Sequence, residues 1–252
     1  MIKFEVLIST LNDGLFNIKL HPDFNYLIIH QITNNKDYSN FISHIVSTRV
    51  RYIPSNTIGL SISRNIALSN SIGEYLWIMD DDVLIYSDAL EKLNNLIKTK
   101  PNQDMYILNF SQTELKNETI EYKKANKYNA MSICSINMLL TKDTAKNHKF
   151  NTNFGLGTNY PSGEEYIFSI ELINKNKKIL ITNEYFSCHP ELSSGNDFYS
   201  SPNRLHAKLK MFLVCYGSIK GRFIYLLFVI KKTNILIKNK AFFRALACLI
   251  KS

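Results

Sequence analysis

Three consecutive aspartates, Asp80, Asp81 and Asp82, directly follow the apolar run Tyr75–Met79. A short apolar run rich in aromatic residues is typical of a buried strand, so the carboxylates are expected at the carboxyl end of a strand. Adjacent carboxylates repel one another unless a cation or ligand hydroxyls take up their charge. Carboxylate clusters suit Mg²⁺ or Mn²⁺, usually together with substrate phosphates. The alternative is that the aspartates only begin a turn or cap a helix.

Arg64 lies upstream of the aspartates in segment 58–70, whose apolar residues have the spacing of a short amphipathic helix. We expect Ser61 or Ser63 to be the N-cap, which places Arg64 in the first turn. A cation is mildly unfavourable there, because the N-terminus of a helix favours anions. Arg64 is therefore predicted to bind a ligand phosphate or one of the aspartates, although arginine is more commonly a solvated surface residue.

A second acidic pair, Glu164 and Glu165, follows Ser162 at the start of an apolar helical segment. Ser162 is a good N-cap residue, and the helix dipole favours acids in a first turn, so the pair has a structural explanation. The chemical alternative is general-base catalysis, because a carboxylate within hydrogen-bond reach of a hydroxyl can accept its proton.

His189 follows a short apolar run and precedes the segment Ser193–Gly195, which is expected to be a mobile loop. A lone histidine after a strand is more often a packed or capping residue than a ligand. Imidazole is nevertheless a common metal ligand, so both roles stay open for His189.

The elements that must position these residues alternate along the chain. Hydrophobic patterning predicts strands near 3–9, 25–31, 48–53, 74–79 and 105–110, and helices near 40–46, 61–70 and 88–99. A hairpin or irregular insertion is expected at 111–130 and a further strand at 132–140. This alternation predicts an α/β fold with a mainly parallel sheet, which binds ligands at the carboxyl ends of its strands.

Composition is consistent with a globular protein: 252 residues with 45% hydrophobic content can form a full core. The four cysteines form no C-x-x-C pair, which argues against a zinc site or a disulfide framework and suits a reducing cytoplasm. The first apolar segment is too short for a signal peptide and has no cleavage site, so we expect a cytoplasmic protein.

The net charge of +9 is concentrated at one end of the chain. Residues 203–252 hold 11 of the 30 basic residues and none of the 21 acidic ones. Their longest apolar run, 223–230, is far shorter than the ~20 residues that cross a bilayer. Basic helices with apolar faces bind anionic membranes, so we expect a peripheral location at the inner face of the cell membrane. Ordinary helices packed on the globular part are the alternative. No recognition helix or aromatic RNA-binding signature supports a nucleic-acid partner.

The segment GLSISRNIALSNSIGEYLWIMDDDV, residues 59–83, resembles the nucleotide-sugar-binding half of family 2 glycosyltransferases. That family typically has a G-x-x-x-x-R-N helix, a strand introduced by G-E, and a run of acidic residues. The resemblance covers about residues 1–195. It implies the GT-A fold, with a Rossmann-like, mainly parallel sheet flanked by helices, in a domain of residues 1–202. Residues 203–252 would form a basic helical extension.

The resemblance also implies roles at the donor end of the site. Asp81 would contact the ribose, Asp82 would carry Mn²⁺ or Mg²⁺ on the donor diphosphate, and Asp80 would support both. His189 would join the metal or the diphosphate. Two further regions would bind the nucleotide, namely Ser9 and Thr10 at the end of the first strand, and Asp37 in place of the family's usual acidic turn.

On the acceptor side, the resemblance rests on the segments Phe154–Gly157 and Gly163–Glu165, which match the FGxG and G-E-D motifs of the family. The second acid of that motif is the general base in inverting members, which implies this role for Glu165. Because the family more often has Asp there, the longer side chain leaves open whether Glu165 or Glu164 reaches the acceptor.

The resemblance implies an inverting, metal-dependent enzyme that moves one hexose, from a UDP-hexose, to a glycan or lipid-linked acceptor. Such a reaction belongs to the assembly of cell-surface polysaccharide, as in capsule or lipopolysaccharide. Processive synthases carry a Q-x-x-R-W motif that this chain lacks. A sugar nucleotidyltransferase would have a glycine-rich loop after the first strand, and here that place reads STLNDG. A non-catalytic scaffold partner of another transferase at the membrane is the remaining alternative.

Overall fold

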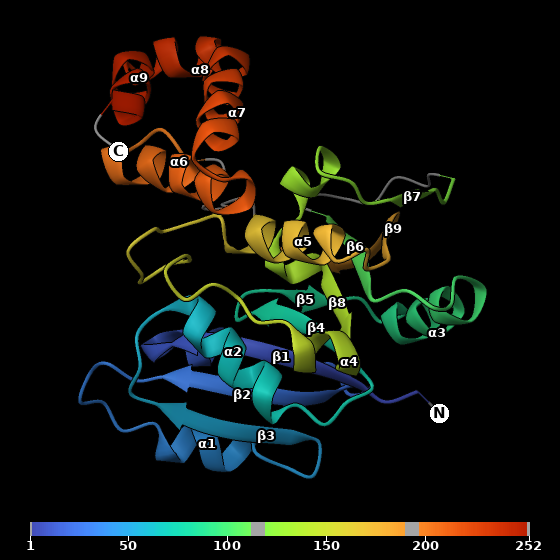
Figure 1. Ribbon diagram of the computed structural model, residues 1–252. Helices are drawn as coiled ribbons and strands as arrows, with labels where there is room; N and C mark the ends of the chain where they lie inside the picture. The colour runs from blue at the N-terminus through green and yellow to red at the C-terminus, as the bar shows by residue number, and fades with distance from the viewer. Residues whose placement is uncertain (1, 112–118, 190–196, 251–252) are drawn as a thin grey trace.

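The structure, a computed structural model, describes residues 2–111, 119–189 and 197–250. A mixed sheet runs through its centre in the order β3-β2-β1-β4-β8-β6-β9-β5, with β7 paired to β9 (Figure 1). The strands are Phe4–Leu11 (β1), Asn25–Gln31 (β2), Val50–Ser55 (β3), Tyr75–Asp80 (β4), Leu84–Ile85 (β5), Met105–Ser111 (β6), Tyr122–Lys124 (β7), Met138–Thr141 (β8) and Ile179–Cys188 (β9).

The first four strands in chain order pair in parallel, as β3-β2-β1-β4. Strand β8 is antiparallel to both of its neighbours, and β6 pairs with β9 in parallel. The sheet is therefore mainly parallel, as predicted, and the carboxyl ends of β1, β2 and β4 lie at one edge.

Helices cover both faces of the sheet (Figure 1). They are Ser39–Ile45 (α1), Leu60–Asn70 (α2), Ala89–Thr99 (α3), Lys142–Asn147 (α4), Glu164–Asn174 (α5), Pro202–Tyr216 (α6), Ser218–Lys231 (α7), Thr233–Lys238 (α8) and Phe242–Ile250 (α9). Side chains of β1 alternate between two hydrophobic clusters, because successive residues of a strand point to opposite faces. Leu7 packs in the cluster with α2 and α5, and Val6 and Ile8 pack in the one with α3.

The strands and helices predicted up to residue 110 are confirmed, with shifts of a few residues at their ends. The strand predicted at 132–140 is wrong for most of its length, because only Met138–Thr141 is extended and two 3₁₀ turns precede it. Ile133, between the two turns, and Ile136, within the second, are buried, so their apolar character reflects burial and not a strand. Trp77 Nε1 anchors the turns by donating to the carbonyl of Ile136 at 2.8 Å.

The predicted insertion at 111–130 contains β7 and the start of a 3₁₀ turn, and its residues 112–118 lie outside the described part of the chain. The segment Ser193–Gly195 also lies outside the described residues.

The helices α6 to α9 gather at one end of the molecule, beyond α5 (Figure 1). Leu205, Leu209 and Phe212 of α6 belong to the same hydrophobic cluster as α5. Within the described residues, none of the helices is both long enough and apolar enough to cross a membrane.

Candidate active site

A cavity of about 710 Å³ opens at the carboxyl ends of β1 and β4. Its walls come from the first turns of α2 and α5, the turns at 131–136 and the helix α6. With the exception of Asp37, the residues predicted for the site all line this cavity. These predicted residues are Ser9, Thr10, Arg64, Asp80, Asp81, Asp82, Glu164, Glu165 and His189.

Asp37 is exposed and does not line the cavity. Its carboxylate instead accepts hydrogen bonds from the backbone N–H and the hydroxyl of Ser39, at 2.9 and 3.0 Å, at the start of α1. These hydrogen bonds hold the pKa of Asp37 below its ordinary value.

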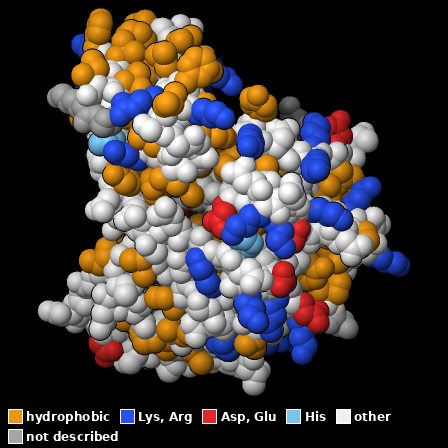
Figure 2. Space-filling view, viewed as in Figure 1, with side chains coloured by type: hydrophobic (Ala, Val, Ile, Leu, Met, Phe, Trp, Pro, Cys, Tyr) orange, Lys and Arg blue, Asp and Glu red, His pale blue; other side chains and the backbone are white. Residues whose placement is uncertain are grey.

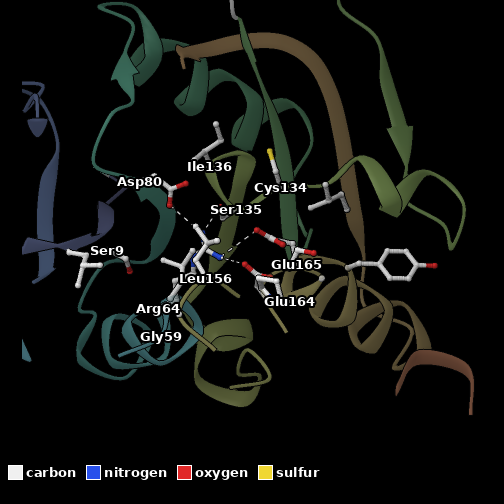
Figure 3. A pocket seen from close by; sticks show the side chains of 18 of the residues that line it. Ser9, Gly59, Arg64, Asp80, Cys134, Ser135, Ile136, Leu156, Glu164 and Glu165 are labelled. Atoms are coloured by element: carbon white, nitrogen blue, oxygen red, sulfur yellow. Dashed lines mark hydrogen bonds and ion pairs between the residues drawn. The ribbon is translucent and has the colours of Figure 1, made fainter. Parts of the chain in front are cut away.

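Arg64 joins the two acidic groups of the site (Figure 3). Its Nη2 donates to Asp80 Oδ1 at 3.2 Å and to the Ser135 hydroxyl at 2.7 Å. Its Nη1 donates to Glu164 Oε1 at 3.1 Å and to Glu165 Oε1 at 3.4 Å. The side chain is only 2% exposed. Burial disfavours the guanidinium charge, but Asp80, Glu165 and Glu164 outweigh that effect and raise the pKa of Arg64.

The start of α2 differs from the prediction. Gly59, with φ of +121°, is the N-cap, so Arg64 falls in the second turn and not the first. The predicted capping residues have tertiary partners instead. Ser61 donates its hydroxyl hydrogen to the carbonyl of Phe154 at 2.6 Å, and Ser63 donates to the Ser9 hydroxyl at 2.9 Å.

Asp81 directly follows β4 and accepts a 2.5 Å hydrogen bond from the hydroxyl of Thr10, near the end of β1. Burial raises the pKa of the Asp81 carboxyl to about 6, and the charges of Asp82 and Asp80 act in the same direction against the Thr10 hydrogen bond. Gly14 lies against this carboxyl, where a Cβ would collide with its oxygen. The glycine therefore makes room for the aspartate at the mouth of the cavity.

Asp82 and His189 meet because β5 and β9 pair between them, with Leu84 opposite Cys188. The two side chains lie 3.2 Å apart, from Nε2 of His189 to Oδ1 of Asp82. The hydrogen bond from His189 holds the pKa of Asp82 below its ordinary value, against the effect of burial.

The described residues contain no group of three His, Cys, Asp or Glu side chains arranged to hold a metal ion. One carboxylate and one imidazole at the cavity wall fit an ion that takes its other ligands from phosphate oxygens and water, as Mg²⁺ commonly does. The residues present therefore suit a metal that arrives with a diphosphate, and not a cage made by the protein alone.

Glu164 and Glu165 begin α5, but the N-cap is Gly163, with φ of +115°, and not Ser162. The two carboxylates differ in environment. The Glu164 side chain is 5% exposed, whereas that of Glu165 is 19% exposed and turned toward the cavity (Figure 3). Burial, together with the charge of Glu165, raises the pKa of Glu164 to about 8. Burial therefore favours the neutral form of Glu164.

Two groups of cavity residues were not predicted from the sequence. Ser135 and Cys134 come from the turns that were predicted as a strand. Lys208 and Met211 come from α6, in the basic segment that was predicted to be a helical extension. Burial lowers the pKa of the Lys208 ammonium, although Glu165 and Glu164 act in the opposite direction. The helical spacing of Leu205, Leu209 and Phe212 was the one signal in the sequence that could have indicated that α6 packs beside the cavity.

The fold is similar to those of several solved structures. The structure of TarS 1–349 from S. aureus in complex with UDP-GlcNAc aligns at a TM-score of 0.60 and 14% identity, covering 84% of this chain and 66% of that one. A second TarS 1–349 structure aligns at 0.61 and 14% identity, covering 99% and 80%. The mannosyltransferase PcManGT from Pyrobaculum calidifontis, in complex with GDP-Man and Mn²⁺, aligns at 0.56 and 11% identity, covering 83% and 63%.

The chain thus spans just under two thirds of the length of the TarS chain in the UDP-GlcNAc complex. No curated protein sequence matches it significantly. The sequence model described as glycosyl transferase family 2 matches residues 32–161, about half of the chain and including Arg64 and the three aspartates. The protein therefore belongs to glycosyltransferase family 2 and has the GT-A fold.

Proposed function

We propose that the protein transfers one hexose from a nucleotide sugar, with a UDP-hexose as the first candidate, to a hydroxyl of a glycan or lipid-linked acceptor. The transfer inverts the anomeric configuration and serves the assembly of cell-surface polysaccharide. The observation that carries the proposal is one cavity with an accessible carboxylate, Glu165, on one wall and the aspartates of β4 on another. The complexes of the neighbours with UDP-GlcNAc and GDP-Man support the class of donor.

Glu165 is the general base in this proposal. It faces the cavity and is held by Arg64, whereas Glu164 is more deeply buried and burial raises its pKa. Glu165 accepts the proton of the acceptor hydroxyl as its oxygen bonds to the anomeric carbon. The bond from that carbon to the diphosphate oxygen breaks, and the nucleoside diphosphate leaves from the opposite face. Attack opposite to the leaving group inverts the configuration.

The donor occupies the strand-end wall in this proposal. Ser9, Thr10 and Asp81 bind the nucleoside hydroxyls, with Thr10 already holding the Asp81 carboxyl in place. Asp82 and His189 would hold Mn²⁺ or Mg²⁺. When bound, such an ion supplies positive charge that stabilises the departing diphosphate.

The test is release of UDP from UDP-hexoses by wild type and by Glu165→Gln, with water as the surrogate acceptor and with MnCl₂ or MgCl₂ present. We expect metal-dependent release that falls at least ~100-fold in Glu165→Gln, because general-base catalysis contributes 10²–10⁴-fold. Glu164→Gln is the matched control and should retain most activity, since Gln resembles the neutral acid. A Glu165→Gln rate within a few-fold of wild type would exclude Glu165 as the base. UDP binding without any turnover would favour the non-catalytic scaffold.

A further inference from the structure

Helix α7 is apolar on two opposite faces. Tyr225, Phe228 and Val229 are buried against the core. A second row, the α7 stripe, points outward and consists of Ile219 (87% exposed), Phe223 (61%), Leu227 (47%) and Ile230 (60%). Spacings of four, four and three residues place these side chains on one helix face. Packing inside the molecule explains only the first row.

The exposed apolar surface continues on the last two helices. Ile237 of α8 is 60% exposed, and Phe243 and Ile250 of α9 are 83% and 86% exposed. Figure 2 shows hydrophobic side chains gathered over this end of the molecule, with Lys and Arg among them. Single exposed apolar residues need no explanation, but a gathering of this kind marks a contact with a partner or a membrane.

The charge of residues 203–252 indicates what kind of partner this apolar surface binds. Exposed cations stand beside the apolar residues, and they include Lys220, Lys231, Lys238, Lys240 and Arg244. No acidic residue occurs anywhere in 203–252. Two copies of this surface would repel one another, so a second copy of the chain is a poor occupant. A bilayer with anionic head groups satisfies the apolar and the charged side chains at once.

We infer that the outer faces of α7, α8 and α9 dock on an anionic lipid bilayer, with the α7 stripe in the acyl boundary and the lysines among the head groups. Helix α6 connects this surface to the active site, because it packs on α7 and also places Lys208 and Met211 in the cavity wall. Docking would therefore hold the cavity close to a lipid-linked acceptor. That consequence rests on the proposed function, whereas the docking itself does not.

Flotation of the full chain with vesicles tests the inference. One set contains phosphatidylcholine alone, and the other contains equal parts of phosphatidylcholine and phosphatidylglycerol. We expect wild type to float with the anionic vesicles only, and less at high salt, because salt screens surface charges. Ile219→Gln and Phe223→Gln each remove an apolar contact with the bilayer, so each should weaken partition into the anionic vesicles roughly tenfold.

Ile72→Gln is the matched control, because Ile72 is 61% exposed, like Phe223, but lies between α2 and β4. It should float as wild type does. Wild type that stays with the unbound fraction, or floats equally with neutral vesicles, would overturn the inference. So would an equal loss in the Ile72→Gln control. UDP release measured on the same variants in solution should be unchanged. If wild type releases UDP but does not float with the vesicles, the docking inference is wrong and the proposed function is unaffected.

Discussion

The chemistry of the site depends on one buried cation shared among three carboxylates. Arg64 binds Asp80, Glu164 and Glu165, so the end of β4 and the start of α5 are held by the same guanidinium. One positive charge cannot neutralise three negative ones, and burial together with the charge of Glu165 raises the pKa of Glu164. This division leaves Glu165 as the carboxylate available to a ligand.

The protonation of Glu164 predicts a pH-dependent contribution to stability. Its pKa in the folded protein, about 8, lies above the ordinary 4.5, so the folded state binds the proton more tightly than the unfolded state. The resulting stabilisation is fully present below pH ~4.5 and is lost as the pH rises through ~8. Glu164→Gln has no proton to lose, so its stability should change less over this range.

Urea unfolding of wild type and Glu164→Gln between pH ~5 and ~9 measures the difference. The stability of wild type relative to the variant should fall as the pH rises. A difference that stays constant, or grows in favour of wild type, would mean that Glu164 is ionised in the folded protein.

Removal of the shared cation should be costly. Arg64→Met leaves three carboxylates without their partner, and breaking a buried ion pair from one side costs about 3–5 kcal/mol. Arg64→Lys should recover only part of that loss, because an ammonium lacks the planar fork that reaches both walls. Chemical denaturation provides the measurement, with Lys98→Met on the exposed surface of α3 as the control. If Arg64→Met lowers the free energy of unfolding by less than about 1 kcal/mol, Arg64 has no structural role of this kind.

At the scale of elements, the hydrophobic periodicity predicted well which segments form helices and which form strands, but it did not predict the helix caps. The strands and helices predicted before residue 110 follow from local patterning, whereas the short strand β5 was not predicted. Ser61, Ser63 and Ser162 are good caps in isolation, but Gly59 and Gly163 take the cap positions. Ser61 and Ser63 bond to the backbone of Phe154 and to Ser9, which lie far away in sequence. No local pattern encodes such partners, so these errors lie at the active site, where tertiary contacts override local preference.

Gly155 is a positive-φ glycine packed against Glu164. Its φ is +106°, and an added Cβ would lie 3.0 Å from Ser61 Oγ and 3.3 Å from the Glu164 carboxyl. Gly155→Ala should cost about 1–3 kcal/mol from backbone strain and lower the UDP release rate as Glu164 is displaced. Gly217→Ala is the control, since Gly217 has φ of +78° but nothing within 4 Å of the added Cβ. If both variants lose equal stability and keep wild-type UDP release, the contact with Glu164 has no role.

At the scale of the whole molecule, the charge pattern and the packing pattern divide the chain differently. Charge separates residues 203–252 from the rest, and that boundary coincides with the first turn of α6. Packing joins α6 to α5, and Lys208 and Met211 enter the cavity. Charge can be read directly from a sequence, whereas the face on which a helix packs against another element can be inferred only indirectly. The cavity wall made by α6 was therefore one part of the site that the sequence did not predict, and the turns at 131–136 were the other.

Nucleotide binding tests the central claim most directly, and thermal unfolding with UDP, with and without MnCl₂, measures it. Ligand at about 100 times its dissociation constant adds roughly 2.7 kcal/mol to the folded state, which is a rise in Tm of about 5–10 °C for a chain of this size. We predict a UDP-induced rise that requires Mn²⁺ and is lost in Asp82→Asn. A cooperatively unfolding wild type whose Tm responds to no nucleoside diphosphate, with or without metal, would contradict a nucleotide-sugar site at this cavity.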